Sequence, residues 1–259
     1  MKKDQFFIGW NGNLSKQNKT LLKRFLIPIF ILVPLLAFIL VYFTKPFADT
    51  HFELGNSKEF IGTYYESPFP VLVLDPGQVS EDLNPNALLV GYGKNGASTF
   101  IEQIEKSQGK LDGLKIKIQG TLIYGDGRVV IELTKKDKSL LEILDGAKMN
   151  NNYSPLAKNS ISLKGEIMDP KCWFGVMKPA EGKVHKSCAI RCISGGIPPV
   201  LKVDEGDSRT YYILKDKNGL NINEEVLSFV AEPVTISGNL SSSSGWNILT
   251  IDAGAIVLD

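Results

Sequence analysis

The longest apolar run of the chain lies near its N-terminus. Residues 25–43 are nineteen positions without a charged side chain. As an α-helix they would span roughly 28 Å, close to the thickness of the hydrocarbon core of a bilayer. Pro28 and Pro34 interrupt the run, but prolines are tolerated in membrane-spanning helices. The pattern therefore predicts a single transmembrane helix over residues 25–43, preceded by an N-terminal segment of residues 1–24.

The charges around this run predict its orientation. Six basic residues precede it against one acidic residue, Asp4; they are Lys2, Lys3, Lys16, Lys19, Lys23 and Arg24. By the positive-inside rule the N-terminal segment is cytoplasmic and the C-terminal part extracytoplasmic, that is, periplasmic for a bacterial inner membrane. The alternative is a cleaved signal peptide, but the run is long for one, and residues 45–48 lack the small residues of a cleavage site. We expect an uncleaved single-pass anchor.

Beyond the anchor the chain is mainly β. Short segments with alternating apolar and polar positions or β-branched runs recur, separated by Gly, Asn and Asp, as hairpins require. They lie at residues 71–74, 88–90, 114–118, 128–133, 161–167, 211–214, 234–236 and 248–251. We expect each of these segments to be a strand.

Two halves of this region resemble each other. Residues 118–122 align with residues 236–240, so that Gly120 meets Gly238, and at the same offset Leu133 meets Ile251. The pattern indicates a tandem repeat of one unit. The alternative is that any two β-rich segments align loosely around glycines.

Each unit reads as three strands, a helix and two strands, with the helices at residues 100–106 and 223–229. This order is typical of the OB-fold, a small five-stranded barrel. We predict two tandem OB-like β-barrels, residues 48–150 and 158–259, linked by the polar run near residues 148–155.

The charge balance of the chain bears on which classes of partner it can bind. Lys and Arg number 29 and Asp and Glu 28, which leaves a net charge of +1. No basic stripe with interleaved aromatics is visible, so we expect no nucleic-acid partner. The fold by itself does not fix a function.

The second unit carries an insertion from about residue 172 to 199 that the first lacks. Residues 181–194 within it predict a short helix, which Gly195 ends. On that helix His185, Cys188 and Cys192 are spaced by three and four residues, so they share one face. Cys172, just after the first strand of the barrel, could meet them there.

Three interpretations of these residues stay open. Cys172, His185, Cys188 and Cys192 could bind one metal ion, and this ligand set suits Zn²⁺ or copper(I). Alternatively Cys172 forms a disulfide with Cys188 or Cys192, as an oxidising compartment favours. In the third interpretation the cysteines are small buried apolar residues.

The string D-x-x-C, G-x-x-H-x-x-C-A-x-x-C and G-x-P resembles a motif of uncharacterised bacterial proteins that are secreted or membrane-anchored. Its positions here are Asp169, Cys172, Gly182, His185, Cys188, Ala189, Cys192, Gly196 and Pro198. The resemblance covers about thirty residues and implies a candidate site at the cysteines and His185, but no activity.

We expect a membrane-anchored metal-binding or redox accessory protein, an accessory subunit of a membrane-bound complex. No nucleophile–base–acid set stands out, so we expect no enzyme. The alternative is a structural or interaction module whose cysteines only staple the insertion. A thiol oxidoreductase is disfavoured because there is no C-x-x-C in a thioredoxin-like context.

Overall fold

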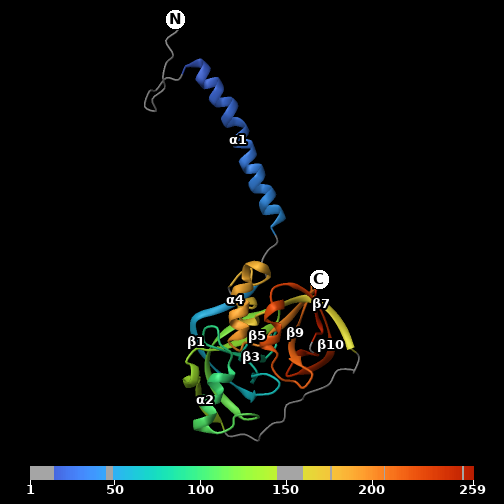
Figure 1. The fold of residues 1–259 in the computed structure, drawn as a ribbon. Coiled ribbons are helices and arrows are strands. Elements are labelled where there is room, and N and C mark those ends of the chain that lie inside the picture. The colour runs from blue at the N-terminus through green and yellow to red at the C-terminus, as the bar shows by residue number, and fades with distance from the viewer. Residues whose placement is uncertain (1–14, 45–48, 145–159, 176, 207, 253) are drawn as a thin grey trace. The chain divides into compact units, whose positions relative to one another are not determined.

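The computed structural model describes residues 15–44, 49–144, 160–175, 177–206, 208–252 and 254–259 (Figure 1). The chain divides into two compact units, residues 1–47 and 48–259. The predicted link near residues 148–155 lies outside the described residues, as do Lys2, Lys3 and Asp4 of the predicted charge pattern.

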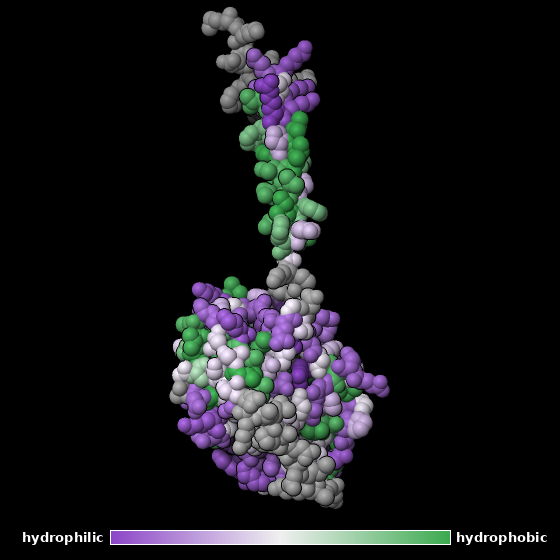
Figure 2. Space-filling model, turned by 90° about the vertical axis from the view of Figure 1, so that its right-hand side faces the viewer, coloured by the Kyte–Doolittle hydropathy of each residue, from purple (hydrophilic) through white to green (hydrophobic). Residues whose placement is uncertain are grey.

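The first unit contains the long helix α1 (Lys16–Phe43). Ser15 caps it, since the Ser15 hydroxyl accepts a hydrogen bond from the Asn18 backbone N–H at 3.3 Å. None of its residues is buried, and its most apolar window has a mean hydropathy of 2.8. Figure 2 shows hydrophobic residues along most of this helix. By length and composition α1 could cross a membrane or act as a signal sequence; it begins nine residues before the predicted span and includes Lys16, Lys19, Lys23 and Arg24.

The first barrel has five strands closed in a ring. They are β1 (Thr50–Tyr65), β2 (Val71–Leu74), β3 (Asn86–Gly91), β4 (Lys115–Gly125) and β5 (Arg128–Leu133). The ring order is β1-β2-β3-β5-β4, with β4 returning to β1 and only β3 and β5 parallel. Helix α2 (Ser98–Gln108) joins β3 to β4. A 3₁₀-helix, η1 (Lys136–Ser139), and an added strand, β6 (Leu140–Leu144), follow, and β6 pairs with β4.

The second barrel repeats this order. Its strands are β7 (Ser160–Met168), β8 (Val200–Glu205), β9 (Ser208–Asp216), β10 (Pro233–Ser243) and β11 (Trp246–Ile251). The short helices α5 (Asn223–Val226) and η2 (Leu227–Phe229) join β9 to β10, and β12 (Ile256–Leu258) pairs with β10. The predicted OB-like barrels are confirmed. Helices α3 (Pro170–Trp173) and α4 (Gly182–Ser194) lie between β7 and β8, where the first barrel has only residues 66–70.

A glycine in the first strand of each barrel allows close contact with the second strand. A Cβ atom on Gly62 of β1 would lie 2.3 Å from the Val73 carbonyl oxygen of β2. A Cβ atom on Gly165 of β7 would lie 2.2 Å from the Lys202 carbonyl oxygen of β8. Both barrels thus bring their first two strands together at a point where no side chain fits.

Three apolar clusters stabilise the compact unit of residues 48–259, which holds both barrels. One lies inside each barrel, and the third, which we call the shared core, combines residues of both. The shared core contains Phe69, Val71, Leu88, Val90, Ile123 and Val130 of the first barrel. From the second barrel and its insertion it contains Met168, Cys172, Trp173, Phe174, Ala180, Cys192, Ile197, Val200, Tyr211, Ile213, Trp246 and Ile248. Strands that contribute to it are buried on both faces, which explains their nearly continuous apolar sequence.

The two barrels meet through equivalent faces. Val71 of β2 pairs with Leu88 of β3, and at the same places in the second barrel Val200 of β8 pairs with Ile213 of β9. All four side chains lie in the shared core. Such a self-complementary interface is typical of two-fold symmetric dimers, so the barrels pack as a pseudo-dimer within one chain. The boundaries at residues 48–150 and 158–259 stay predictions.

Candidate metal centre

Helix α3 places the first cysteine. The Asp169 carboxylate oxygen Oδ1 accepts hydrogen bonds from the backbone N–H groups of Lys171 at 2.9 Å and Cys172 at 3.1 Å. Aspartate is a favoured N-cap, and Pro170 suits the first helical position. This single turn directs the Cys172 thiol into the shared core.

Helix α4 presents the other three predicted residues. His185 and Cys192 are buried, and Cys188 is partly exposed, as expected for one helix face. Val184, next to His185 in the chain, lies off this face and is 83% exposed. The helix ends at Gly195 and Gly196, and Gly196 takes a φ of +98°, a backbone conformation that favours glycine.

The side chains from both helices converge. The Cys172 and Cys188 sulfur atoms are 3.9 Å apart, and His185 Nε2 is 3.9 Å from Asp169 Oδ2. Donor atoms of Cys172, His185 and Cys188 lie within 4.8 Å of one another, and so do those of Asp169, Cys172 and Cys192. Two ligands bound tetrahedrally at about 2.3 Å from a metal would be roughly 3.8 Å apart. The spacing therefore suits a metal ion.

Asp169 is the site residue that sequence reasoning missed. An aspartate at the end of a strand is usually exposed to solvent, although this one opens the D-x-x-C string. In the structure its side chain is fully buried, and Oδ2 has no hydrogen-bond partner among the described residues. The same is true of His185 Nε2. Unpaired buried polar atoms are costly, so both atoms point to a role in binding.

Burial also affects the thiols. The pKa of the Cys172 thiol is raised well above its usual range, first by its hydrogen bond with Cys192, then by burial and by the nearby Asp169 carboxylate. All three cysteines are free, and the sulfur atoms of Cys172 and Cys188 are 3.9 Å apart, longer than a disulfide bond of about 2.05 Å. The disulfide interpretation remains an alternative.

A loop of the first barrel contacts the site. Residues 91–96 form a turn, in which the Gly91 N–H donates a hydrogen bond to the Asn95 carbonyl at 2.8 Å. From this turn, Lys94 Nζ reaches Cys188 Sγ at 3.4 Å. The hydrogen bond with Cys188 is the main cause that raises the pKa of Lys94. The first barrel thus supplies a positive charge beside the one partly exposed cysteine.

The backbones of the two barrels touch at the same place. Gly96 N–H donates to the Gly195 carbonyl at 2.8 Å. A Cβ atom on Gly195 would lie 1.9 Å from the Lys94 carbonyl oxygen, and one on Gly96 would lie 2.1 Å from the Gly196 carbonyl oxygen. Only glycine permits this approach, which ties the end of α4 to the loop.

A buried ion pair fixes α3 against the first barrel. Lys171 Nζ donates to Glu132 Oε1 at 2.5 Å and to the carbonyl oxygens of Gly91 at 2.8 Å and Gly93 at 2.5 Å. Both charged side chains are at least 92% buried. Because all three ammonium protons have acceptors, the geometry offsets much of the desolvation cost of the charges.

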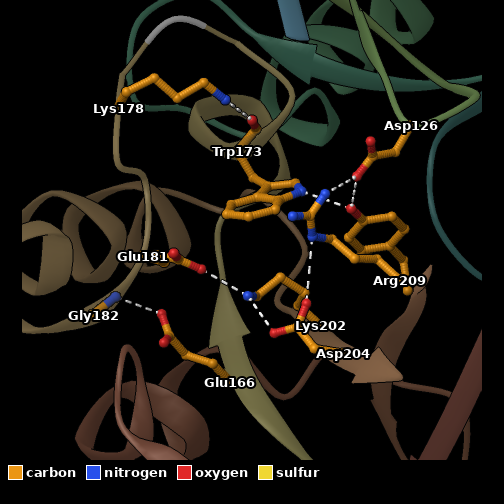
Figure 3. Close-up of polar contacts among 10 residues, drawn as sticks. Asp126, Glu166, Trp173, Lys178, Glu181, Gly182, Lys202, Asp204 and Arg209 are labelled. Carbon is orange, nitrogen blue, oxygen red and sulfur yellow. Dashed lines mark hydrogen bonds and ion pairs between the residues drawn. The ribbon is translucent and has the colours of Figure 1, made fainter. Parts of the chain in front are cut away.

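A polar network surrounds Trp173, the neighbour of Cys172 (Figure 3). Its indole N–H donates to the Tyr211 hydroxyl at 2.8 Å, and this hydroxyl donates to Asp126. Three cations lie over the indole ring, at 4.7 Å for Lys202, 5.5 Å for Lys178 and 5.6 Å for Arg209. Such cation–π contacts hold the ring in place. The Glu166 carboxylate, whose pKa is raised mainly by burial, accepts from the Gly182 N–H at the start of α4.

Together these contacts build the site from both barrels. The structure brings the four predicted residues into two groups that share Cys172: Cys172, His185 and Cys188 form one, and Cys172 and Cys192 form the other together with Asp169. Lys94 lies beside Cys188. Neither Lys94 nor Lys171 carries a local sequence signal for this role, because each acts across the interface. Comparison of the chain with protein-family models, with curated proteins and with solved structures finds no match.

The buried ion pair yields a first prediction. We expect Lys171→Met to lower the free energy of unfolding by about 3–5 kcal/mol, because it leaves the Glu132 carboxylate buried and unpaired. The double variant with Glu132→Gln should recover part of this loss. Chemical denaturation measures both. As a control, Lys217→Met removes an exposed ion pair with Asp252 and should cost less than about 1 kcal/mol. A Lys171→Met variant as stable as the parent would contradict the assignment.

Proposed function

We propose that this chain is a membrane-anchored metal-binding protein without catalytic activity, an accessory subunit of a membrane-bound complex. One observation carries the metal proposal. His185 Nε2 and Asp169 Oδ2 are buried without hydrogen-bond partners among the described residues, 3.9 Å apart, beside the thiols of Cys172 and Cys188. A cation bound there would satisfy both atoms.

The donor types favour zinc. Sulfur, imidazole nitrogen and carboxylate oxygen are all ligands of Zn²⁺. Copper(I) suits the thiolates but not the carboxylate, so it is the second choice. The proposed ligands are Cys172, His185, Cys188 and Cys192, with Asp169 either completing the shell or orienting His185 through a hydrogen bond that closes on binding.

Burial of the donors favours a closed site. His185 is 6% exposed and Cys192 1%, and only Cys188 is partly open to solvent. Structural sites use all their positions for protein ligands, whereas catalytic sites keep one position for water or substrate. This supports a non-enzymatic role, in which the metal stabilises the insertion or is handed on to a partner.

The membrane part of the proposal rests on α1. Its apolar side chains are exposed along the whole helix, and four basic residues gather in its N-terminal part; they are Lys16, Lys19, Lys23 and Arg24. We propose that α1 is an uncleaved anchor with the N-terminus in the cytoplasm and the barrels outside it. We propose that the barrels, held at the membrane by this anchor, serve a neighbouring membrane-bound complex.

Metal content tests the central claim. Protein purified with its anchor should hold one ion per chain, and His185→Ala should weaken metal binding by at least tenfold, since even the loss of residues behind metal ligands costs 10–100-fold. Elemental analysis and a competition titration give both numbers. Ser187→Ala, an exposed position on the same helix, should leave binding unchanged. Absence of metal together with one free thiol would favour the disulfide-stapled module instead.

The role of Asp169 needs two substitutions. Asparagine caps helices as well as aspartate does, so Asp169→Asn should keep α3 intact while weakening metal binding about 10–100-fold. Asp169→Ala should also lose about 1 kcal/mol of stability because the cap is gone. If Asp169→Asn binds metal like the parent and only Asp169→Ala is impaired, Asp169 is a cap alone.

Fusion reporters test the membrane orientation. Alkaline phosphatase, which is active only outside the cytoplasm, should be active when fused after Asp259, and a fluorescent protein that needs the cytoplasm should be dark there. An epitope tag before Met1 should stay on the full-length protein, whereas a cleaved signal sequence would remove it. Phosphatase inactive after Asp259, or a tag lost from the mature protein, would refute the proposed anchor.

A further inference from the structure

A second feature lies between the barrels, apart from the metal centre. It is a cleft of about 430 Å³, lined among others by Pro68 from the β1–β2 connection and by Lys215, Asn218, Ile248 and Thr250. The last four residues come from β9, the loop after it, and β11. The volume is within the range of small-molecule sites.

The pseudo-symmetry of the barrels explains why this cleft exists. Val130 of β5 corresponds to Ile248 of β11, so Glu132 corresponds to Thr250. At Glu132 the insertion of the second barrel, residues 169–199, fills the interface with Lys171. At Thr250 the facing connection is residues 66–70, which are too few to fill the equivalent space. The interface between the barrels is therefore filled at Glu132 and open at Thr250.

A buried cation lies at the open side. Lys215 pairs in register with Thr250 and is 2% exposed. Its ammonium donates to the Asn221 side-chain oxygen at 2.6 Å. Among the described residues no carboxylate forms an ion pair with it. The neighbouring Asp216 carboxylate instead accepts hydrogen bonds from the backbone N–H groups of Asn218 and Leu220.

This arrangement is costly for the fold. A buried charge without a counter-charge is destabilising, and burial lowers the pKa of Lys215 to about 8. The first barrel shows that the position does not require a lysine, because Val90 occupies the equivalent place beside Glu132 and packs in the shared core. The hydrogen bond to Asn221 leaves the charge of Lys215 uncompensated, whereas a ligand carrying the missing negative charge would compensate it.

We propose that this cleft binds a small organic carboxylate, with its carboxylate group on the Lys215 ammonium and its apolar part against Pro68 and Ile248. A carboxylate matches a single buried cation. A phosphate would need more positive charge than one lysine supplies. The second cation of the cleft, Lys217, is exposed and lies 3.6 Å from Asp252. The proposal is independent of the metal centre.

Ligand-observed NMR on the full chain in detergent micelles tests it. Butyrate is the probe, with inorganic phosphate and n-butylamine as comparisons at constant ionic strength. We expect butyrate to bind, butylamine not to bind, and phosphate to bind at least tenfold more weakly than butyrate. Lys215→Met should weaken butyrate binding by about tenfold or more, because it removes a charge-assisted hydrogen bond. Lys217→Met, the matched control in the same cleft, should retain binding.

A second variant keeps the test conclusive if Lys215→Met fails to fold. Asn221→Asp places a carboxylate where Lys215 now meets an amide oxygen, so it should abolish butyrate binding while the thermal melting temperature stays equal or rises. The proposal is overturned if butyrate binds no chain at all, if it binds Lys215→Met and Asn221→Asp like the parent, or if phosphate binds and butyrate does not.

Discussion

The shared core between the barrels is the constraint on which the rest of the structure depends. Trp246 lies at its centre, fully buried, with its ring edge-on to Phe69 and Phe174 at 6.4 Å between centroids. Large aromatic side chains contribute much of the free energy of such contacts. Because Cys172 and Cys192 belong to the same cluster, the candidate metal centre forms only where the two barrels meet.

The barrel strands were predictable because their signal is local. Alternation and β-branched runs predicted segments of eight strands. Gly120 and Gly238 align because each lies too close to a neighbouring strand, β5 or β11, for a side chain to fit. The face of α4 was predictable for the same reason, since a spacing of three and four places His185, Cys188 and Cys192 together. Helix α3 was not predicted, because four residues show no periodicity.

The contribution of the first barrel to the site could not be predicted from the sequence. Lys94 and Lys171 are ordinary lysines in the printed chain, and their partners are 94 and 39 residues away. Asp169 could have been suspected from its place before Cys172, but an aspartate after a strand is more often a solvated cap. Burial distinguishes a site residue from a solvated cap, and burial depends on the packing of α3 and α4 against both barrels.

The two barrels carry opposite buried charges at neighbouring positions. The first barrel has a buried carboxylate, Glu132, whose partner Lys171 comes from within the chain. The second barrel has a buried ammonium, Lys215, beside the equivalent position. Equivalent places on the interface between the barrels thus differ, one filled by an inserted segment and one left as an open cleft.

The glycine contact between residue 96 and residues 195 and 196 bears on modularity. Repeated barrels are usually regarded as units that can be exchanged or transplanted. Here the main chain of one copy occupies the space where any side chain of the other would begin. The second barrel, which carries the cysteines and His185, therefore cannot be moved to another protein alone. A new neighbour would have to supply the same stretch of backbone without side chains.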